Sequence, residues 1–209
     1  MVLVTPDAQR TMNTFLGITA EYSTEELNPE ALKQSSYLYI EGYLVASPTG
    51  KIAAIKAREL AEKNSVKTSL TLSDPNMVNF FKDGMKEIIG NKVDLLFANE
   101  IEALAFCETE DLSSAAEKLK EYADTFAITL GEKGALLWDG KQFIEVAGHK
   151  VVAVDSNGAG DMFAGAFLSQ ICQGKNFLDA GNFACKAASQ VVAKFGPRLE
   201  KEQAASLLQ

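Results

Sequence analysis

The sequence alternates short apolar runs with segments of helical periodicity, and this alternation limits the folds open to the chain more than any other feature. The runs are residues 37–40, 67–72, 93–97 and 126–130, of which all but the more polar 67–72 are mostly apolar, and each predicts a strand. Between the first two runs, residues 48–63 carry Ile52, Ile55 and Leu60 on one side of a predicted helix. Strands that alternate with helices through right-handed crossovers predict a doubly wound, mostly parallel α/β sheet, whose ligands bind at the carboxyl ends of the strands.

The length and composition are those of an ordinary globular protein. The chain has 209 residues, of which 47% are hydrophobic and 23% charged, enough for one well-buried core. A formal net charge of −8 argues against nucleic acid or an anionic membrane as a partner. We therefore expect a single domain over residues 1–209.

The cysteines and the chain start bear on location. Cys107, Cys172 and Cys185 lie far apart without a Cys-x-x-Cys pair, which fits reduced thiols better than disulfides or a zinc site. No apolar run reaches the length of a transmembrane helix, and the first residues lack the basic region of a signal peptide. The predicted location is cytoplasmic.

A glycine-rich turn lies between an apolar run and a helical stretch near the C-terminus. Residues 151–154 are apolar and mostly β-branched, which predicts a buried strand, and Phe163 and Phe167 then lie on one helical face. Gly158 and Gly160 lie between them and let an anion approach the backbone closely. Because a helix start aims free N–H groups and a positive dipole end at one point, the turn predicts an anion site.

Asp161 follows this turn and is predicted to project from the first helical turn beside the anion. A carboxylate in that place can accept the proton of a hydroxyl that attacks phosphorus. The structural alternative is that Asp161 balances the helix dipole, an arrangement worth a few tenths to about 1 kcal/mol. Spacing alone leaves both hypotheses open.

Residues 155–161, Asp-Ser-Asn-Gly-Ala-Gly-Asp, resemble the C-terminal signature Asp-Thr-x-Gly-Ala-Gly-Asp of the ribokinase-like (PfkB-type) carbohydrate and nucleoside kinases. The resemblance implies that Asp161 is the catalytic base. It also implies that Gly158, Ala159 and Gly160 form the anion hole for the transferring phosphate. The one departure is Ser156 in place of Thr, which keeps the hydroxyl group.

Asn99 and Glu102 follow the run at 93–97 and share one face of a predicted helix. An amide and a carboxylate placed there could orient water around Mg²⁺, which takes few direct protein ligands. The alternative is a capped helix start with acidic residues in its first turn. The pair resembles the family's Asn-x-x-Glu motif, which implies that Asn99 acts in phosphate binding and Glu102 in Mg²⁺ binding at the edge that holds the glycine turn.

Residues 129–134, Thr-Leu-Gly-Glu-Lys-Gly, resemble the family's Thr-x-Gly-x-x-Gly segment, which implies that Thr129, Gly131 and Gly134 line the ribose and base of ATP. Two glycines three apart also fit the entry to any β-hairpin. In the family, the helix corresponding to residues 180–192 closes the adenine side, and Cys185 takes a place that is Asn in many members.

The resemblance implies ATP and Mg²⁺ as cofactors. A monovalent cation, K⁺, is often bound near the glycine turn in this family, and Asp155, Asn157 and Gly196 match that region loosely. The one histidine, His149, is predicted to be a surface loop residue. Neither a P-loop motif nor a dinucleotide-binding Gly-x-Gly-x-x-Gly occurs.

Several stretches look most similar to the adenosine kinase branch, namely residues 42–48, 72–75, 96–102 and 165–170. Tyr43 matches a position where an aromatic ring can stack on a nucleoside base, with core packing as the alternative. The resemblance implies transfer of the γ-phosphate of ATP to a primary hydroxyl of an adenosine-like nucleoside or of a sugar, as in ribokinases and fructokinases. A non-catalytic nucleotide-binding fragment of the same fold is the rival hypothesis.

The resemblance covers nearly the whole chain but only the C-terminal two-thirds of a typical family member. Strands predicted at residues 2–5 and 11–17 place residues 1–20 as lid or edge strands of an N-terminally incomplete domain. In the family, the absent third supplies the opening strands of the sheet, most of the lid and acceptor-binding residues, so turnover by this fragment alone is doubtful. The expected partner is a small-molecule nucleoside or sugar. Whether the protein forms a homodimer is left open.

Overall fold

The computed structural model describes residues 1–207 and divides into two compact units. The central unit comprises residues 16–128 and 138–142. The terminal unit comprises residues 1–15, 129–137 and those from 143 onward. The expectation of a single domain over residues 1–209 stays a prediction.

Parallel strands form the centre of the central unit. Parallel pairing joins β3 (Tyr37–Glu41), β4 (Lys67–Thr71) and β5 (Val93–Asn99), and β6 (Ala123–Thr129) lies next to β5. The register pairs Ile40 with Leu70 and Leu70 with Leu96. Leu95 and Leu96 are both fully buried, and successive strand residues point to opposite faces, so both faces of β5 are covered. The predicted α/β class is therefore confirmed.

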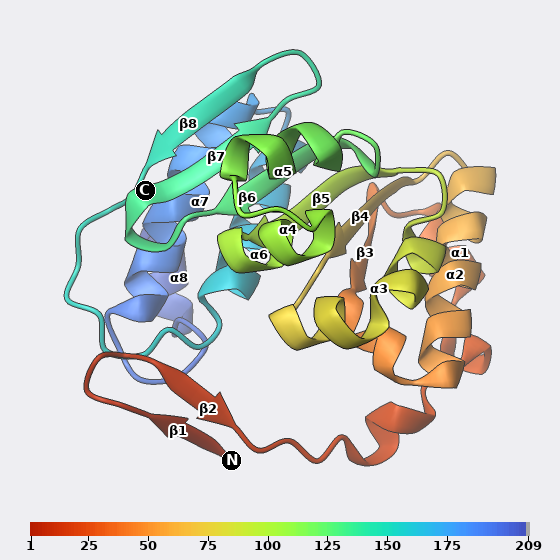
Figure 1. Ribbon diagram of the computed structural model, residues 1–209, viewed down its shortest axis with the longest axis horizontal. Helices are drawn as coiled ribbons and strands as arrows, with labels where there is room; N and C mark the ends of the chain where they lie inside the picture. Colours follow the sequence, from red (N-terminus) through yellow and green to blue (C-terminus); the bar gives the residue numbers. More distant parts are fainter. Residues whose placement is uncertain (208–209) are drawn as a thin grey trace. The chain divides into compact units, whose positions relative to one another are not determined.

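Helices connect these strands, and most begin at a side-chain cap. They are α1 (Pro29–Lys33), α2 (Pro48–Lys63), α3 (Pro75–Ile89), α4 (Glu100–Cys107) and α5 (Leu112–Leu119), with short 3₁₀ turns at η1 (Gly17–Glu21), η2 (Thr24–Glu26) and η3 (Gly42–Ala46). Ser47 and Asp74 each accept a backbone N–H, and a proline follows each at the first helical position. Figure 1 shows α4 and α5, in green, in front of the strands of this unit.

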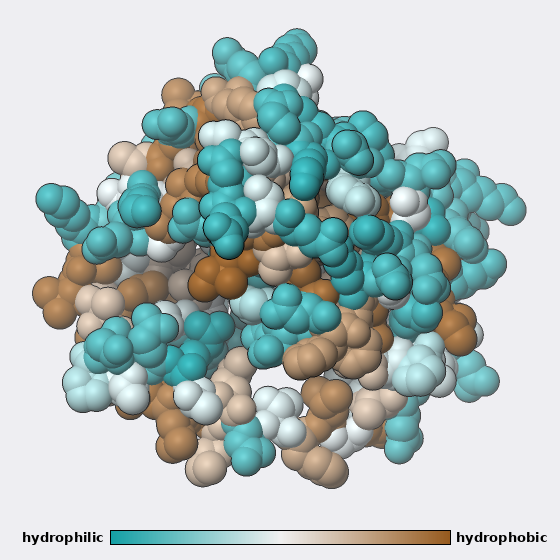
Figure 2. Space-filling model, viewed as in Figure 1, coloured by the Kyte–Doolittle hydropathy of each residue, from teal (hydrophilic) through white to brown (hydrophobic). Residues whose placement is uncertain are grey.

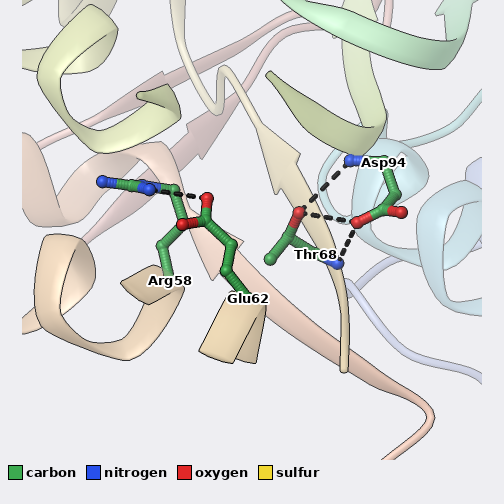
Figure 3. Close-up of polar contacts among 4 residues, drawn as sticks. All are labelled: Arg58, Glu62, Thr68 and Asp94. Carbon is green, nitrogen blue, oxygen red and sulfur yellow. Dashed lines mark hydrogen bonds and ion pairs between the residues drawn. The ribbon is translucent and has the colours of Figure 1, made fainter. Parts of the chain in front are cut away.

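Polar contacts fix the start of the central strands and one turn of α2 (Figure 3). Asp94 Oδ2 accepts hydrogen bonds from Thr68 N at 2.7 Å and from Thr68 Oγ1 at 2.9 Å, which joins β4 to β5. On α2, Arg58 Nη1 lies 2.6 Å from Glu62 Oε1. All four residues belong to the central unit, so these contacts stabilise its strands and helix.

The terminal unit contains two hairpins and three helices. The strands are β1 (Val2–Val4) with β2 (Arg10–Met12), and β7 (Gly134–Trp138) with β8 (Phe143–Ala147); the helices are α6 (Ala159–Cys172), α7 (Phe177–Val192) and α8 (Lys201–Ser206), with a 3₁₀ turn at η4 (Gly131–Lys133). Gly181 of α7 packs against Leu137 and Val146, where an added Cβ would meet each side chain at 2.8 Å. In Figure 1, α7, in blue, accordingly lies beside β7 and β8.

The N-terminal hairpin is shorter than predicted, because its second strand ends at Met12 rather than at residue 17. Its large side chains Val2, Leu3 and Met12 are exposed. A two-stranded hairpin is marginally stable by itself, so its position depends on contacts made by its turn. Figure 2 shows hydrophobic residues exposed among the hydrophilic ones on the visible face.

The prediction of a buried strand at residues 151–154 was wrong. The segment forms no strand, and Val151 is 40% and Val152 84% exposed. Val154 N and Asp155 N both donate to Val192 O, at 2.9 and 3.2 Å, so the segment is fixed to the end of α7. A run of four apolar residues does not by itself specify strand pairing.

No helix in the described part of the chain combines the length and hydropathy needed to cross a membrane. The cytoplasmic location stays a prediction.

Candidate functional site

The glycine turn takes a backbone conformation that requires glycine. Gly158 has φ +77° and directly precedes α6. A Cβ at Gly158 would lie 2.3 Å from Pro197 O, far closer than atoms can approach. A side chain is therefore excluded at Gly158 by both backbone conformation and space. At Gly160, by contrast, a Cβ would meet nothing within 4 Å, so the turn is open on that side.

The start of α6 lacks the side-chain cap found elsewhere in the protein. The helices α2, α3, α4, α5 and α7 each begin with a side chain that accepts a backbone N–H. Among the side chains that the structure describes, none caps α6. Within residues 1–207, the N–H groups of Gly158, Gly160 and Asp161 have no hydrogen-bond acceptor, whereas the N–H of Ala159, also predicted for the anion hole, donates to Ser156 O at 3.4 Å. Three donors at the positive end of a helix dipole are thus available to an anion.

Asp161 is the third residue of α6 and is exposed. Its carboxylate makes no hydrogen bond or ion pair with the residues that the structure describes. It is therefore available to a ligand bound at the helix start.

Asp155 ties the glycine turn to a neighbouring loop. Its side chain is only 4% exposed. Oδ1 accepts a hydrogen bond from Asn157 N at 2.9 Å, and Oδ2 accepts one from Gly196 N at 3.0 Å. This carboxylate thus fixes the position of the residues that precede α6.

Ser156 joins the turn to the N-terminal hairpin. Its backbone N–H donates to Ala8 O at 3.3 Å, and Ala8 is 3% exposed. Arg10 Nη1 donates to Ser156 Oγ, also at 3.3 Å. A guanidinium group therefore lies beside the glycine turn. Sequence analysis missed Arg10, because no local pattern links it to a turn 146 residues away.

A cavity of about 800 Å³ opens at the same place within the terminal unit. This volume lies in the range of small-molecule sites. The predicted residues that line it are Thr129, Gly131, Gly134, Ala159, Gly160 and Cys185. Lys133, Ala188 and Ser189 also line it and belong to the 129–134 segment and the 180–192 helix that the resemblance implicated, whereas Gly148 and Lys150 were missed by sequence analysis. His149, predicted as a surface loop residue, is exposed and also lines the cavity.

One wall of the cavity is a face of α7 made of small side chains. Cys185, Ala188 and Ser189 lie at i, i+3 and i+4 and so share this face. The Ser189 hydroxyl donates to Lys186 O at 2.8 Å. Burial raises the pKa of the Cys185 thiol to about 11, so the thiol is neutral near pH 7. This face of α7 is thus uncharged and made of small side chains, on which a flat ring could pack.

Asn99 and Glu102 form a reciprocal cap at the start of α4. Glu102 N donates to Asn99 Oδ1 at 2.8 Å, and Asn99 N donates to Glu102 Oε2 at 2.9 Å. Asn99 Nδ2 also donates to Glu102 Oε1 at 2.7 Å, and Glu102 is 5% exposed. An amide next to a carboxylate is a donor set that suits a Mg²⁺ ion held mainly by water and phosphate. The pair belongs to the central unit, and its meeting with the glycine turn stays a prediction.

Tyr43 lies in η3 of the central unit and is exposed. Its hydroxyl donates to Ser73 O at 3.2 Å, which fixes the ring beside the loop that follows β4. The stacking role of Tyr43 stays a prediction.

The chain matches the pfkB family of carbohydrate kinases over residues 1–204. It is 31% identical over 194 residues to adenosine kinase 1 of Arabidopsis thaliana, an alignment that covers 84% of this chain and 56% of that protein. Its structure is similar to that of adenosine kinase from Sinorhizobium meliloti, with a TM-score of 0.94 and 34% identity, over 99% of this chain and 64% of the other. A probable sugar kinase from Rhizobium etli CFN 42 gives a TM-score of 0.94 and 32% identity, over 99% and 63% of the two chains.

The predicted resemblance and the ribokinase-like α/β fold are thus confirmed. The chain spans little more than half the length of the Arabidopsis relative. The match over residues 1–204 includes the glycine turn, the cavity walls and the Asn99–Glu102 cap. This chain belongs to the pfkB family of carbohydrate kinases.

Proposed function

We propose that the protein transfers the γ-phosphate of ATP to a primary hydroxyl of a small molecule, with an adenosine-like nucleoside as the first candidate acceptor. Membership of a carbohydrate kinase family supports the reaction class. The observation that carries the proposal is the uncapped start of α6, whose free N–H groups adjoin a cavity of about 800 Å³. A nucleotide in this cavity would have its phosphates at the positive end of the helix.

In the proposed reaction, Asp161 accepts the proton of the acceptor hydroxyl as its oxygen attacks the γ-phosphorus. The bond between this phosphorus and the β–γ bridging oxygen breaks, and ADP leaves with that oxygen. The N–H groups of Gly158, Gly160 and Asp161 stabilise the negative charge of the transferring group, since the helix start already holds these donors in place. The exposed, unpartnered carboxylate of Asp161 supports this role.

Arg10 gives the site a second source of positive charge. Its contact with Ser156 Oγ places the guanidinium next to the residues that precede α6. A guanidinium binds phosphate oxygens through paired N–H donors. We assign Arg10 to the transferring phosphate, and the buried turn at Ala8 would hold the hairpin in place.

Thr129, Gly131 and Gly134 would line the nucleotide's ribose and base, opposite the Cys185 face of α7. Asn99 would act in phosphate binding and Glu102 in Mg²⁺ binding. A bound Mg²⁺ would supply positive charge that offsets part of the charge of the phosphates. A monovalent cation such as K⁺ near Asp155, Asn157 and Gly196 remains part of the proposal.

Two observations support a nucleoside as the acceptor. The Arabidopsis and Sinorhizobium relatives are adenosine kinases, and the exposed Tyr43 ring could stack on a base. The similarity to a probable sugar kinase keeps a ribokinase- or fructokinase-type acceptor as the second candidate. A homodimer is one assembly that the full-length protein could adopt.

The test is an ADP-release screen of the full-length protein with adenosine, other nucleosides, ribose, fructose and 2-keto-3-deoxygluconate. The proposal expects acceptor-dependent ADP release that requires Mg²⁺, with adenosine the most active. Release only with a sugar would favour the second candidate. ATP binding by calorimetry without ADP release for any acceptor would contradict the kinase proposal and favour a non-catalytic nucleotide-binding protein.

A further inference from the structure

Two glycines meet at the open end of the β7–β8 hairpin. A Cβ at Gly148 would lie 2.1 Å from Glu132 O, and a Cβ at Gly134 would lie 2.0 Å from Val146 O. Both obstacles are backbone atoms, which cannot rotate away as a side-chain end can. Gly134 belongs to the glycine pattern identified in the sequence, whereas Gly148 belongs to no motif there.

The close contact between the backbone at Gly148 and the turn at residues 131–134 joins two walls of the cavity. Gly148 N donates to Lys133 O at 3.1 Å, so residue 148 lies directly on the turn at residues 131–134. Both the 131–134 turn and the 148–151 segment line the cavity. Three residues beyond the second segment, Val154 N donates to Val192 O. The chain from residue 148 to residue 154 is therefore held by backbone hydrogen bonds at both ends.

We propose that Gly148 is a positioning residue of the nucleotide cavity, because its missing side chain sets the spacing between these two walls. The inference rests on the proposed function, since it assumes that the cavity binds ATP. Gly148 lines the cavity but has no side chain to bind a ligand. It acts through the backbone of Glu132 and Lys133.

The geometry gives the size of the effect. Real Cβ atoms essentially never approach another atom closer than 3.0 Å, so Gly148→Ala must move a wall by about 1 Å. Misplacement of binding groups by about 1 Å can reduce rates by up to roughly 100-fold. Gly148 is not among the glycines with positive φ, so backbone strain does not compete as an explanation.

The test compares Gly148→Ala with Gly181→Ala in the full-length protein. At Gly181 an added Cβ also meets atoms at 2.8 Å, but these are the side-chain ends of Leu137 and Val146, and Gly181 does not line the cavity. It therefore controls for general loss of stability. The measurements are KM for ATP, KM for the acceptor, and the melting temperature.

We expect Gly148→Ala to raise KM for ATP by about 10- to 100-fold. KM for the acceptor should stay within about twofold, and Gly181→Ala should leave both constants near wild type. An unchanged KM for ATP in Gly148→Ala would overturn the inference. The inference would also be overturned if Gly181→Ala raised KM for ATP as much as Gly148→Ala does, at the same fall in melting temperature.

Hydrogen exchange on the wild-type protein tests the inference even where Gly148→Ala fails to fold. ATP should slow exchange at residues 131–134 and 148–151 together with the start of α6. Slowing at α6 alone would overturn the role of Gly148 and leave the proposed function standing. A wild-type protein that shows no ATP-dependent change anywhere would overturn the proposed function itself.

Discussion

Arg10 Nη1 lies 3.3 Å from Ser156 Oγ, although 146 residues separate them in the sequence. Ser156 also donates its backbone N–H to Ala8 O at 3.3 Å, so two contacts seat the N-terminal hairpin on the glycine turn. Because Ala8 is buried and the strands on either side of it are largely exposed, the turn of this hairpin is its anchor. A cation is thereby held beside the free N–H groups at the start of α6.

Replacing Arg10 by Gln should lower kcat by about 10- to 100-fold, because a charged donor to the transferring phosphate is lost. Arg10→Lys should recover part of the rate, since a single ammonium replaces the two-pronged guanidinium. Lys175→Gln removes an exposed positive charge from the loop after α6 and serves as the control. Steady-state kinetics with saturating ATP make the comparison. Equal rates for Arg10→Gln and Lys175→Gln would contradict the role of Arg10.

The parts of the structure that could be predicted from the sequence are those fixed by neighbouring residues. Ser47-Pro48 begins α2 and Asp74-Pro75 begins α3, because each cap bonds to an N–H two or three residues away. The glycine turn before α6 is equally local, since Gly158 needs a left-handed φ.

The parts of the fold and site that sequence analysis did not predict depend on contacts between distant residues. The apolar residues 151–154 could not be assigned correctly, because their backbone bonds to the end of α7 and has no strand partner. Arg10, Gly148 and His149 reach the site only through the folded hairpins. Short sequence patterns carry no information on such contacts.

Gly158 and Gly174 form a matched pair for the anion turn. Their φ angles are +77° and +80°, but a Cβ at Gly158 meets Pro197 O at 2.3 Å and one at Gly174 meets nothing within 4 Å. Gly174→Ala should therefore cost only the strain of a left-handed residue, about 1–2 kcal/mol of unfolding free energy. Gly158→Ala should lower the unfolding free energy by more than this. It should also abolish ATP binding, because the new Cβ forces the backbone at residue 158 away from Pro197.

Chemical denaturation and calorimetry with ATP separate these two effects. Retained ATP affinity in a folded Gly158→Ala protein would contradict the assignment of this turn to the nucleotide phosphates.

Glu102 allows the structural and functional hypotheses to be separated. Glu102→Gln keeps an acceptor for Asn99 N but removes the negative charge, so the α4 cap should survive with a stability loss of about 1 kcal/mol or less. If Glu102 acts on Mg²⁺, the Mg²⁺ concentration for half-maximal rate should rise at least about tenfold.

The control is Glu26→Gln, since Glu26 closes a similar cap with Ser23 at η2. An identical Mg²⁺ dependence in both variants would leave Glu102 a helix cap alone.

Asp161 and Asp179 provide the most direct test of the central claim, that Asp161 is the base at the start of α6. Each is the third residue of its helix, Asp161 in α6 and Asp179 in α7, so both balance a helix dipole equally well. Asp179 is paired with Asn176 Nδ2 at 2.9 Å, whereas Asp161 has no partner in the described chain.

The decisive measurement is kcat of full-length Asp161→Asn and Asp179→Asn, alongside ATP affinity by calorimetry. If Asp161 is the base, Asp161→Asn lowers kcat by at least about 100-fold while ATP still binds, and Asp179→Asn stays near wild type. Near wild-type turnover by Asp161→Asn, or an equal loss in both variants, would contradict this role.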